Sequence, residues 1–450
     1  MKNVAVISLG CDKNRVDTEH MLYRLVRGGC AVSDIADAQI IIVNTCAFIE
    51  SAREESIDNI LQCAEFKKSG KCEKLIVTGC LPQKHRDELV SALPEVDAFL
   101  GAFEYDKILD VAGVSDTAEH AETAATAVLQ ADGACAEFAA AENCGRLLTT
   151  FPHVAYLKIA EGCNNKCTFC TIPSIRGAYR SRPIADIKRE AEKLVADGVQ
   201  EIILVAQDVS RYGRDRGSSL AELLTELESV DAVLRLMYCY PEEVSDELID
   251  KIAASRNIAK YIDIPIQHCS DKILKLMNRR TTGAAIEKLI NKLHKRGITV
   301  RTTLMVGFPG ETQKEFDELC AFVKRVKPDY AGVFAYSKED GTAAAHLPNQ
   351  VKKSDKIKRV NALGRICTCV TREFNNSFIG KTVKVRYEDV DFDKNLFVGR
   401  ALFQAPDVDG VVYFKADRVD VGKLYDITVT KCDNYDLYGK CVSADCSAED

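Results

Sequence analysis

Three cysteines stand within eight residues in the middle of the chain. Cys163, Cys167 and Cys170 have the spacing Cys-x3-Cys-x2-Cys, and the aromatic residue Phe169 precedes the last of them. Three thiolates on one short loop can hold three irons of a four-iron cubane cluster, which leaves the fourth iron without a protein ligand. An open position on a metal centre is where a substrate or cofactor binds.

A zinc knuckle and a disulfide cluster are the alternative uses of such a triplet. Zinc sites have four ligands, usually in separated pairs, and no second CxxC pair or HxxxH motif completes this one. The total of 19 cysteines is odd, and 450 residues is far longer than the small secreted domains that disulfides stabilise. The spacing therefore favours an iron–sulfur cluster.

A second cysteine set is predicted from the order of the elements in the first domain. Apolar strands at residues 3–8, 39–43 and 74–78 alternate with helical stretches at 14–27 and 49–66, which indicates a parallel sheet. The cysteines that follow the three strands are Cys11, Cys46 and Cys80. Loops at the carboxyl ends of parallel strands share one edge, where ligands bind. We therefore expect these cysteines to bind a second cluster; the alternative is that they are small core residues.

Composition limits the class of protein. Hydrophobic residues make up 46% of the chain and charged residues 28%, as in a soluble globular protein. The net charge of −7 gives no basic footprint for nucleic acid, and no apolar run is long enough to span a membrane. The apolar N-terminus is short and charged residues follow it, unlike a lipoprotein signal. A reducing cytoplasmic location is expected, because the thiolates must stay reduced to bind metal.

Four regions are predicted along the chain. Residues 1–114 form the N-terminal α/β domain with its parallel sheet. Residues 115–148 are an alanine-rich, acidic linker, which is either a solvated helix or a disordered tether. Residues 149–375 form a partial TIM-like (β/α) barrel, with strands at 201–206, 233–237, 261–266, 298–306 and 331–336. Residues 376–446 form a small antiparallel β-barrel of the oligonucleotide-binding type, with strands at 382–387, 396–402, 411–414 and 425–431.

The cysteine triplet, with Phe169 before its last member, resembles the signature of the radical S-adenosylmethionine (SAM) enzymes. The resemblance implies that SAM binds the open iron. One electron from the cluster would then split SAM into methionine and a deoxyadenosyl radical. The order of the domains further resembles the methylthiotransferases, in which the last domain is called TRAM. This resemblance covers nearly the whole chain apart from the linker.

Several stretches look like the RimO branch of that family, which modifies an aspartate of small-subunit ribosomal protein twelve. They are residues 8–17, 44–56, 161–164, 173–183, 265–268 and 334–342. The resemblance implies two 4Fe-4S clusters, one on each cysteine set, and SAM in two roles, as methyl donor and as radical source. The radical would take hydrogen from the aspartate β-carbon, and the second cluster would present the sulfur. An electron donor such as flavodoxin or ferredoxin and a sulfur source are implied as partners.

The charge of the last domain gives an argument about the substrate that does not depend on the family resemblance. Residues 376–450 contain 10 Lys and Arg against 14 Asp and Glu. A tRNA-binding barrel should be basic, because phosphate contacts supply much of the affinity. An acidic barrel suits a basic ribosomal protein and argues against a direct tRNA substrate; the alternative is that its acidity aids solubility. The rival functions are tRNA methylthiolation, as in the MiaB branch, and a non-catalytic iron–sulfur adaptor on the ribosome.

Polar residues at strand ends are the remaining candidates. Gln207 and Asp208 follow the strand after the cysteine loop and are expected to bind SAM, or else to cap that strand. Arg176 and Arg182 are expected to bind the SAM carboxylate or the substrate aspartate. His268 is either a substrate contact or a packing histidine. Residues 307–311 either approach adenine or form a helix N-terminal turn.

Overall fold

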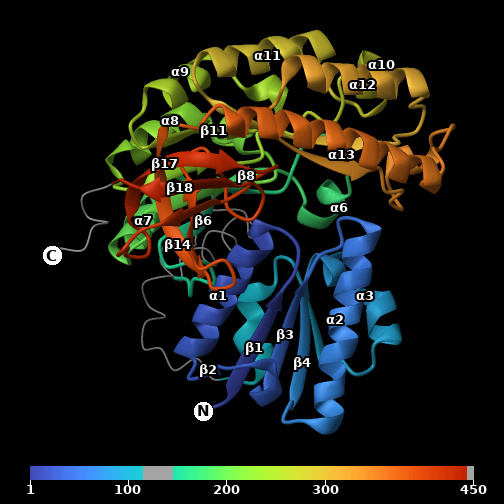
Figure 1. The fold of residues 1–450 in the computed structure, drawn as a ribbon. Coiled ribbons are helices and arrows are strands. Elements are labelled where there is room, and N and C mark those ends of the chain that lie inside the picture. The colour runs from blue at the N-terminus through green and yellow to red at the C-terminus, as the bar shows by residue number, and fades with distance from the viewer. Residues whose placement is uncertain (115–144, 443–450) are drawn as a thin grey trace.

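The computed structural model describes residues 1–114 and 145–442, which form three sheet-based domains (Figure 1). The predicted linker at 115–148 lies for the most part outside the described residues. In Figure 1 the blue N-terminal sheet lies below the central helices, and the red C-terminal barrel lies beside α1. Among the described residues, no helix is long and apolar enough to cross a membrane.

The N-terminal domain is the predicted α/β unit with a five-stranded parallel sheet. Its strand order is β2-β1-β3-β4-β5. The strands are β1 (Asn3–Ser8), β2 (Ala31–Val32), β3 (Ile40–Thr45), β4 (Lys74–Gly79) and β5 (Ala98–Gly101). The helices are α1 (Asp12–Arg27), α2 (Glu50–Ser69), α3 (Cys80–Ala92) and α4 (Ile108–Ala112). The apolar strands are buried between helices on both faces, as parallel sheets require.

The central domain is an open, six-stranded parallel sheet, as expected of a partial barrel. Its strand order is β13-β12-β11-β10-β9-β6. The strands are β6 (Val154–Lys158), β9 (Glu201–Val205), β10 (Val233–Leu236), β11 (Ile258–Asp263), β12 (Thr299–Val306) and β13 (Tyr330–Ala335). The short strands β7 (Ala160–Glu161) and β8 (Arg180–Ser181) form a separate antiparallel pair.

One central strand was placed wrongly by the sequence pattern. The prediction put it at 261–266, but β11 ends at Asp263. Pro265 has no backbone N–H to give to a neighbouring strand, and Gln267 has a positive φ of 68°. The ladder therefore stops before the proline, although the apolar residues continue.

Helices cover one face of the central sheet. They are α7 (Ile184–Ala196), α8 (Leu220–Glu226), α9 (Asp246–Ala254), α10 (Asp271–Leu276), α11 (Gly283–Lys295), α12 (Gln313–Val326) and α13 (Lys353–Asn376). The short helix α6 (Ile172–Arg176) packs against the N-terminal domain through Ile175. Ala155 and Leu157 of β6 pack with these helices in the main core. The alternate residue, Tyr156, points to the other face, as strand geometry requires.

The C-terminal domain is a closed five-stranded barrel. Its strand order is β14-β15-β16-β18-β17. The strands are β14 (Thr382–Asp391), β15 (Leu396–Ala401), β16 (Val412–Lys415), β17 (Leu424–Cys432) and β18 (Leu437–Cys441). All neighbours pair antiparallel except β16 and β18, which pair parallel. β18 was not predicted, since its short sequence contains Gly439 and Lys440 and gives little strand pattern.

The inner face of the central sheet is covered by the other two domains. Val16 of α1 packs there against Tyr156 and Tyr261, together with Ala405 from the C-terminal barrel. Buried ion pairs add to this contact: Arg400 lies 2.8 Å from Glu201 at the start of β9. The first turn of α1 is thus fixed against the central sheet.

Candidate active site with two cysteine sets

The first set, called the strand-end set, consists of Cys11, Cys46 and Cys80. Cys11 caps the start of α1 after β1, Cys46 follows β3, and Cys80 begins α3 directly after β4. These strands are neighbours in the parallel sheet, so their carboxyl ends share one edge. A Cβ added at Gly10 would lie 2.7 Å from the Cβ of Cys46 and 3.1 Å from its Sγ. The loops of the first two cysteines are therefore in direct contact.

Asn14 joins all three loops of the strand-end set. Its Nδ2 donates to the carbonyl oxygens of Leu9 (3.0 Å) and Thr45 (2.9 Å). Its Oδ1 lies 3.7 Å from the thiol of Cys80. Burial, together with the smaller effect of the Cys11 charge, raises the pKa of Cys46 to about 12. The three thiols are thus gathered in one place, as a three-thiolate cluster site requires.

The second set, called the loop set, consists of Cys163, Cys167 and Cys170. The loop begins with a sharp turn at Gly162, whose φ is +79°. A Cβ at this position would lie 2.1 Å from the carbonyl oxygen of Ala178, so only glycine fits. The turn lets the backbone N–H of Cys163 donate to the carbonyl of Gly177 at 3.1 Å.

Asp208, predicted to bind SAM, is hydrogen-bonded to the cysteine loop. Asn165 donates to its Oδ2 at 2.8 Å, and Ser210 donates to its Oδ1 at 2.7 Å. The Tyr179 hydroxyl donates to its backbone carbonyl at 2.9 Å. Burial raises the pKa of Asp208 above its usual value. Both carboxylate oxygens thus accept protein donors that hold the loop, and direct contact with SAM stays a prediction.

Gln207 offers one open hydrogen-bond acceptor beside the loop. Its Nε2 donates to Glu161 at 2.7 Å. Its Oε1 is buried and accepts no hydrogen bond from the residues that the structure describes. A buried acceptor without a donor is costly, so this atom fits a ligand N–H, such as the amino group of SAM.

Tyr240 and Arg279 contact the loop set and were not predicted. The Tyr240 hydroxyl lies 2.6 Å from the sulfur of Cys167. The guanidinium of Arg279 lies 3.8 Å from the centre of the Tyr240 ring. Tyr240 lies four residues after β10, in a strand-end loop of the kind where function was expected. Arg279 follows α10, and no sequence pattern marked it.

Arg176 links the two cysteine sets. Its guanidinium donates to Asp17 (3.0 Å) on α1 and to Glu161 (3.1 Å) before the cysteine loop. It also donates to Asn14, and its charge lowers the pKa of the Cys80 thiol, which burial raises. The predicted role in binding SAM or aspartate stays a prediction.

Two other candidates have structural partners. Arg182 is buried, donates to the carbonyl of Lys158 at 2.8 Å and pairs with Glu190 at 2.7 Å. His268 is fully buried; its Nδ1 accepts from the Ser270 N–H at 2.9 Å, and its Nε2 lies 3.6 Å from Glu311. The Nε2 atom forms no hydrogen bond with the described residues, so both the substrate contact and the packing role of His268 stay predictions.

The loop at 307–311 is closed by its own last residue. Glu311 accepts from the Gly307 N–H at 2.9 Å and pairs with Arg359 at 2.7 Å. Phe308 is fully buried against Tyr336. The contact with adenine stays a prediction.

Neither cysteine set forms a preassembled site for a single metal ion among the described residues. Across residues 1–114 and 145–442, no three His, Cys, Asp or Glu side chains are arranged to hold one metal ion. Zinc needs its ligands around a single ion, whereas each thiolate of a cubane site binds a different iron.

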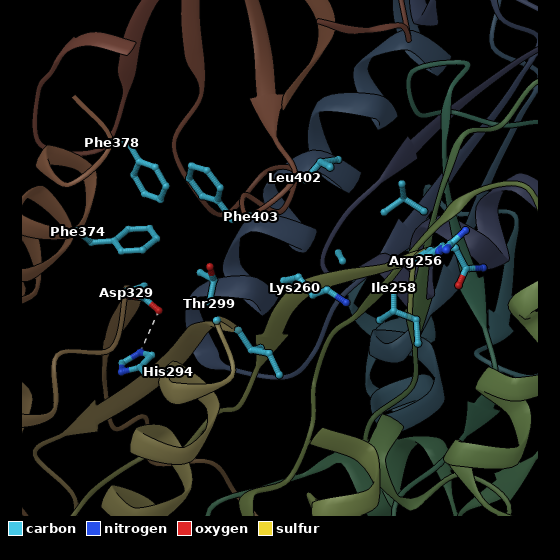
Figure 2. A pocket seen from close by; sticks show the side chains of 15 residues that line it. Arg256, Ile258, Lys260, His294, Thr299, Asp329, Phe374, Phe378, Leu402 and Phe403 are labelled. Atoms are coloured by element: carbon cyan, nitrogen blue, oxygen red, sulfur yellow. Dashed lines mark hydrogen bonds and ion pairs between the residues drawn. The ribbon is translucent and has the colours of Figure 1, made fainter. Parts of the chain in front are cut away.

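A cavity of about 580 Å³ lies at the opposite end of the central sheet (Figure 2). It is lined by the residues that begin β10, β11 and β12 and by Phe374, Phe378 and Phe403. Figure 2 shows the three phenylalanines at one side and Arg256 at the other. None of the predicted site residues lines it, so it is separate from the cysteine sets.

Three family models match the chain. The radical SAM superfamily matches residues 157–323, the uncharacterized protein family UPF0004 matches 3–101, and the TRAM domain matches 379–442. Among solved structures, the radical SAM methyltransferase TsrM from Kitasatospora setae superposes with a TM-score of 0.53 at 14% identity. It covers 76% of this chain and 77% of its own, which shows the shared fold.

Curated relatives match over almost the full length. The protein named ribosomal protein uS12 methylthiotransferase RimO from Clostridium botulinum is 44% identical over 447 residues, which are 97% of each chain. The protein of the same name from Acetivibrio thermocellus is 45% identical over 98% of this chain and 99% of its own. This chain therefore belongs to the RimO family of radical SAM methylthiotransferases.

Proposed function

We propose that this protein is a radical SAM enzyme that adds a methylthio group to the β-carbon of an aspartate in ribosomal protein uS12, the small-subunit protein twelve. The observation that carries the proposal is the joining of the two cysteine sets. Arg176 donates to Asp17 on α1 and to Glu161, which lies two residues before Cys163. The Tyr238 hydroxyl donates to Asp12, beside Cys11, at 2.8 Å. Relatives named for this reaction match the chain over nearly its whole length.

The two sets suit different parts of the reaction. A 4Fe-4S cluster with SAM on Cys163, Cys167 and Cys170 would supply the one-electron chemistry that breaks an inert C–H bond, and a second cluster on Cys11, Cys46 and Cys80 would supply the sulfur. Gln207 would accept a hydrogen bond from SAM through its open Oε1. Asp208 would keep the cysteine loop in place through Asn165. A flavodoxin- or ferredoxin-like electron donor and a sulfur source complete the reaction in the cytoplasm.

Buried ion pairs between the sets hold the geometry. Lys158 and Arg176 are both buried and both bond to Asp17 and Glu161. Such a network is rigid and excludes water. We infer that it fixes the separation of the two sets and protects a reactive radical from solvent.

The charge at the C-terminal end of the chain bears on the substrate. Residues 376–450, with 10 basic against 14 acidic residues, favour a basic protein over tRNA. The decisive experiment is mass spectrometry of uS12 and of tRNA from a strain that lacks the gene. Loss of one methylthio group from uS12, restored by the wild-type gene, supports the proposal. The same loss on tRNA would refute it, and failure of the purified protein to form deoxyadenosine from SAM would favour a non-catalytic adaptor.

A further inference from the structure

The first turn of α1 carries a buried lysine that belongs to neither cysteine set. Lys13 stands two residues after Cys11, and only 7% of its surface is exposed. One turn later, Val16 packs on the inner face of the central sheet with Tyr156 and Tyr261. Lys13 therefore lies where the domain of the strand-end set meets the domain of the loop set.

The ammonium group of Lys13 lies against the ring of Tyr238. The Nζ of Lys13 lies 3.7 Å from the centre of the Tyr238 ring. Tyr238 follows β10, and its φ of +60° is unusual for a residue with a side chain. Its hydroxyl donates to Asp12, and Tyr240, two residues later, touches Cys167. The ammonium group thus lies at the junction of the loops that carry the two sets.

Lys13 forms no direct ion pair in the part of the chain that the structure describes, although its charge opposes the burial that raises the pKa of Asp263. No ion pair or hydrogen bond of its side chain is formed there, in contrast to Lys158 and Arg176, which both bond to Asp17 and Glu161. The two carboxylates that bond to Tyr238 also have other roles to fill. Asp12 accepts from Tyr238, and Asp263 accepts from Arg301 at 3.1 Å and from the Tyr238 N–H at 3.1 Å.

A buried cation is costly unless an anion pairs with it. The face of an aromatic ring offsets only part of that cost, about 1–2 kcal/mol. The position of Lys13 is therefore suited to an anion that arrives with a ligand.

We propose that the ammonium group of Lys13 binds the side-chain carboxylate of the target aspartate. This rests on the proposed function, which supplies the aspartate. The carboxylate carbon is bonded directly to the β-carbon, so a cation that holds the carboxylate also positions the C–H bond to be broken. Lys13 then selects aspartate over asparagine, because the neutral amide cannot form the charge-assisted bond.

The test is the affinity of the reconstituted holoenzyme for labelled uS12, measured by fluorescence anisotropy without SAM or reductant. Wild-type enzyme is expected to bind uS12 about 10- to 100-fold more tightly than uS12 with asparagine at the target position. Lys13→Met should abolish this preference, and Lys13→Arg should keep most of it. Lys67→Met, which removes a surface lysine paired with Asp97, should leave the preference at the wild-type ratio.

The outcomes separate the inference from the function on which it rests. A wild-type ratio in Lys13→Met overturns the inference. If Lys13→Met loses iron or changes the EPR signal of the clusters but keeps the preference for aspartate, the inference is also overturned, because Lys13 would then support the clusters. If wild-type enzyme binds neither form of uS12, the proposed function itself fails. Lys13→Gln keeps a polar side chain and replaces Lys13→Met if that variant does not fold.

Discussion

The two cysteine sets reach the same kind of site by different routes. The loop set takes its three cysteines from eight consecutive residues, and one turn at Gly162 is enough to present them. The strand-end set takes one cysteine from the end of each of three strands, and these cysteines span 70 residues of sequence. The first site is local in the chain, whereas the second exists only when the sheet has formed.

The chemical surroundings are nevertheless alike. Burial raises the pKa of Cys46 in the strand-end set to about 12. Burial also raises the pKa of Cys163 to about 11 and of Cys170 to about 12 in the loop set. In both sets the thiols must lose protons to bind metal, so cluster binding is expected to release protons. The difference between the sets is one of assembly rather than of ligand chemistry.

The largest effect is expected from removing each set completely. Wild-type protein reconstituted without oxygen should carry about eight irons, and either triple alanine variant about four. Replacing Cys163, Cys167 and Cys170 should abolish SAM cleavage. Replacing Cys11, Cys46 and Cys80 should leave cleavage and stop sulfur transfer. Deoxyadenosine and modified uS12, both measured by mass spectrometry, check this division.

Two results would contradict separate roles for the two cysteine sets. Loss of SAM cleavage in the Cys11, Cys46 and Cys80 variant would mean that the sets do not act separately. About four irons in the wild-type protein would mean that only one set binds a cluster.

Replacing Arg176 should have the next largest effect. Arg176→Met leaves the buried carboxylates of Asp17 and Glu161 to share Lys158, and breaking a buried ion pair costs about 3–5 kcal/mol. The free energy of unfolding, measured with urea, should fall by that amount. The Cys80 thiol also loses a neighbouring positive charge, so iron should be lost from the strand-end set first.

A surface arginine supplies the control for Arg176. Arg189 pairs with Asp186 at 3.0 Å, but its side chain is 67% exposed. Arg189→Met should cost less than about 1 kcal/mol, as exposed pairs do. Equal losses in the two variants would show that the Arg176 network does not stabilise the junction.

Two glycine substitutions compare the sets with a smaller change. Gly162→Ala forces a Cβ to within 2.1 Å of the Ala178 carbonyl, and Gly10→Ala forces one to within 2.7 Å of the Cys46 Cβ. Both positions have a positive φ, and a strained residue there costs about 1–3 kcal/mol. Iron measured in each variant should fall at the loop set in the first and at the strand-end set in the second. A reversed pattern would contradict the assignment of the two turns.

Much of the fold followed from sequence pattern, because apolar strands and strand-end cysteines repeat regularly in the N-terminal domain. β1 was found at its predicted bounds, and Cys11, Cys46 and Cys80 follow three neighbouring strands. The contacts of Tyr240 and Arg279 with the loop set were not predictable, since three separate loops must meet to form them. For the same reason the protein partners of Arg176 and Asp208 could not be predicted, and their contacts with a ligand stay predictions.

The smallest predicted effect is on the reactivity of the thiols after the metal has been removed. With a pKa of about 11 or 12, each of Cys46, Cys163 and Cys170 is almost wholly protonated at pH 8. Only the thiolate reacts with iodoacetamide, so the alkylation rate of each should rise about tenfold per pH unit from pH 7 to pH 10. An unperturbed thiol, with a pKa of about 8.5, would level off in this range.

Mass spectrometry of the cysteine peptides gives the rate for each position, and exposed Cys369 of α13 calibrates the reagent. Equal slopes at Cys46, Cys163 and Cys170 would support the same surroundings in both sets. A plateau confined to Cys46 would mean that the strand-end set opens when metal is lost, while the loop set keeps its shape. That result would show that the strand-end set depends more on its cluster than the loop set does. A site made by tertiary structure should be the first to lose its form when the cluster no longer joins its three loops.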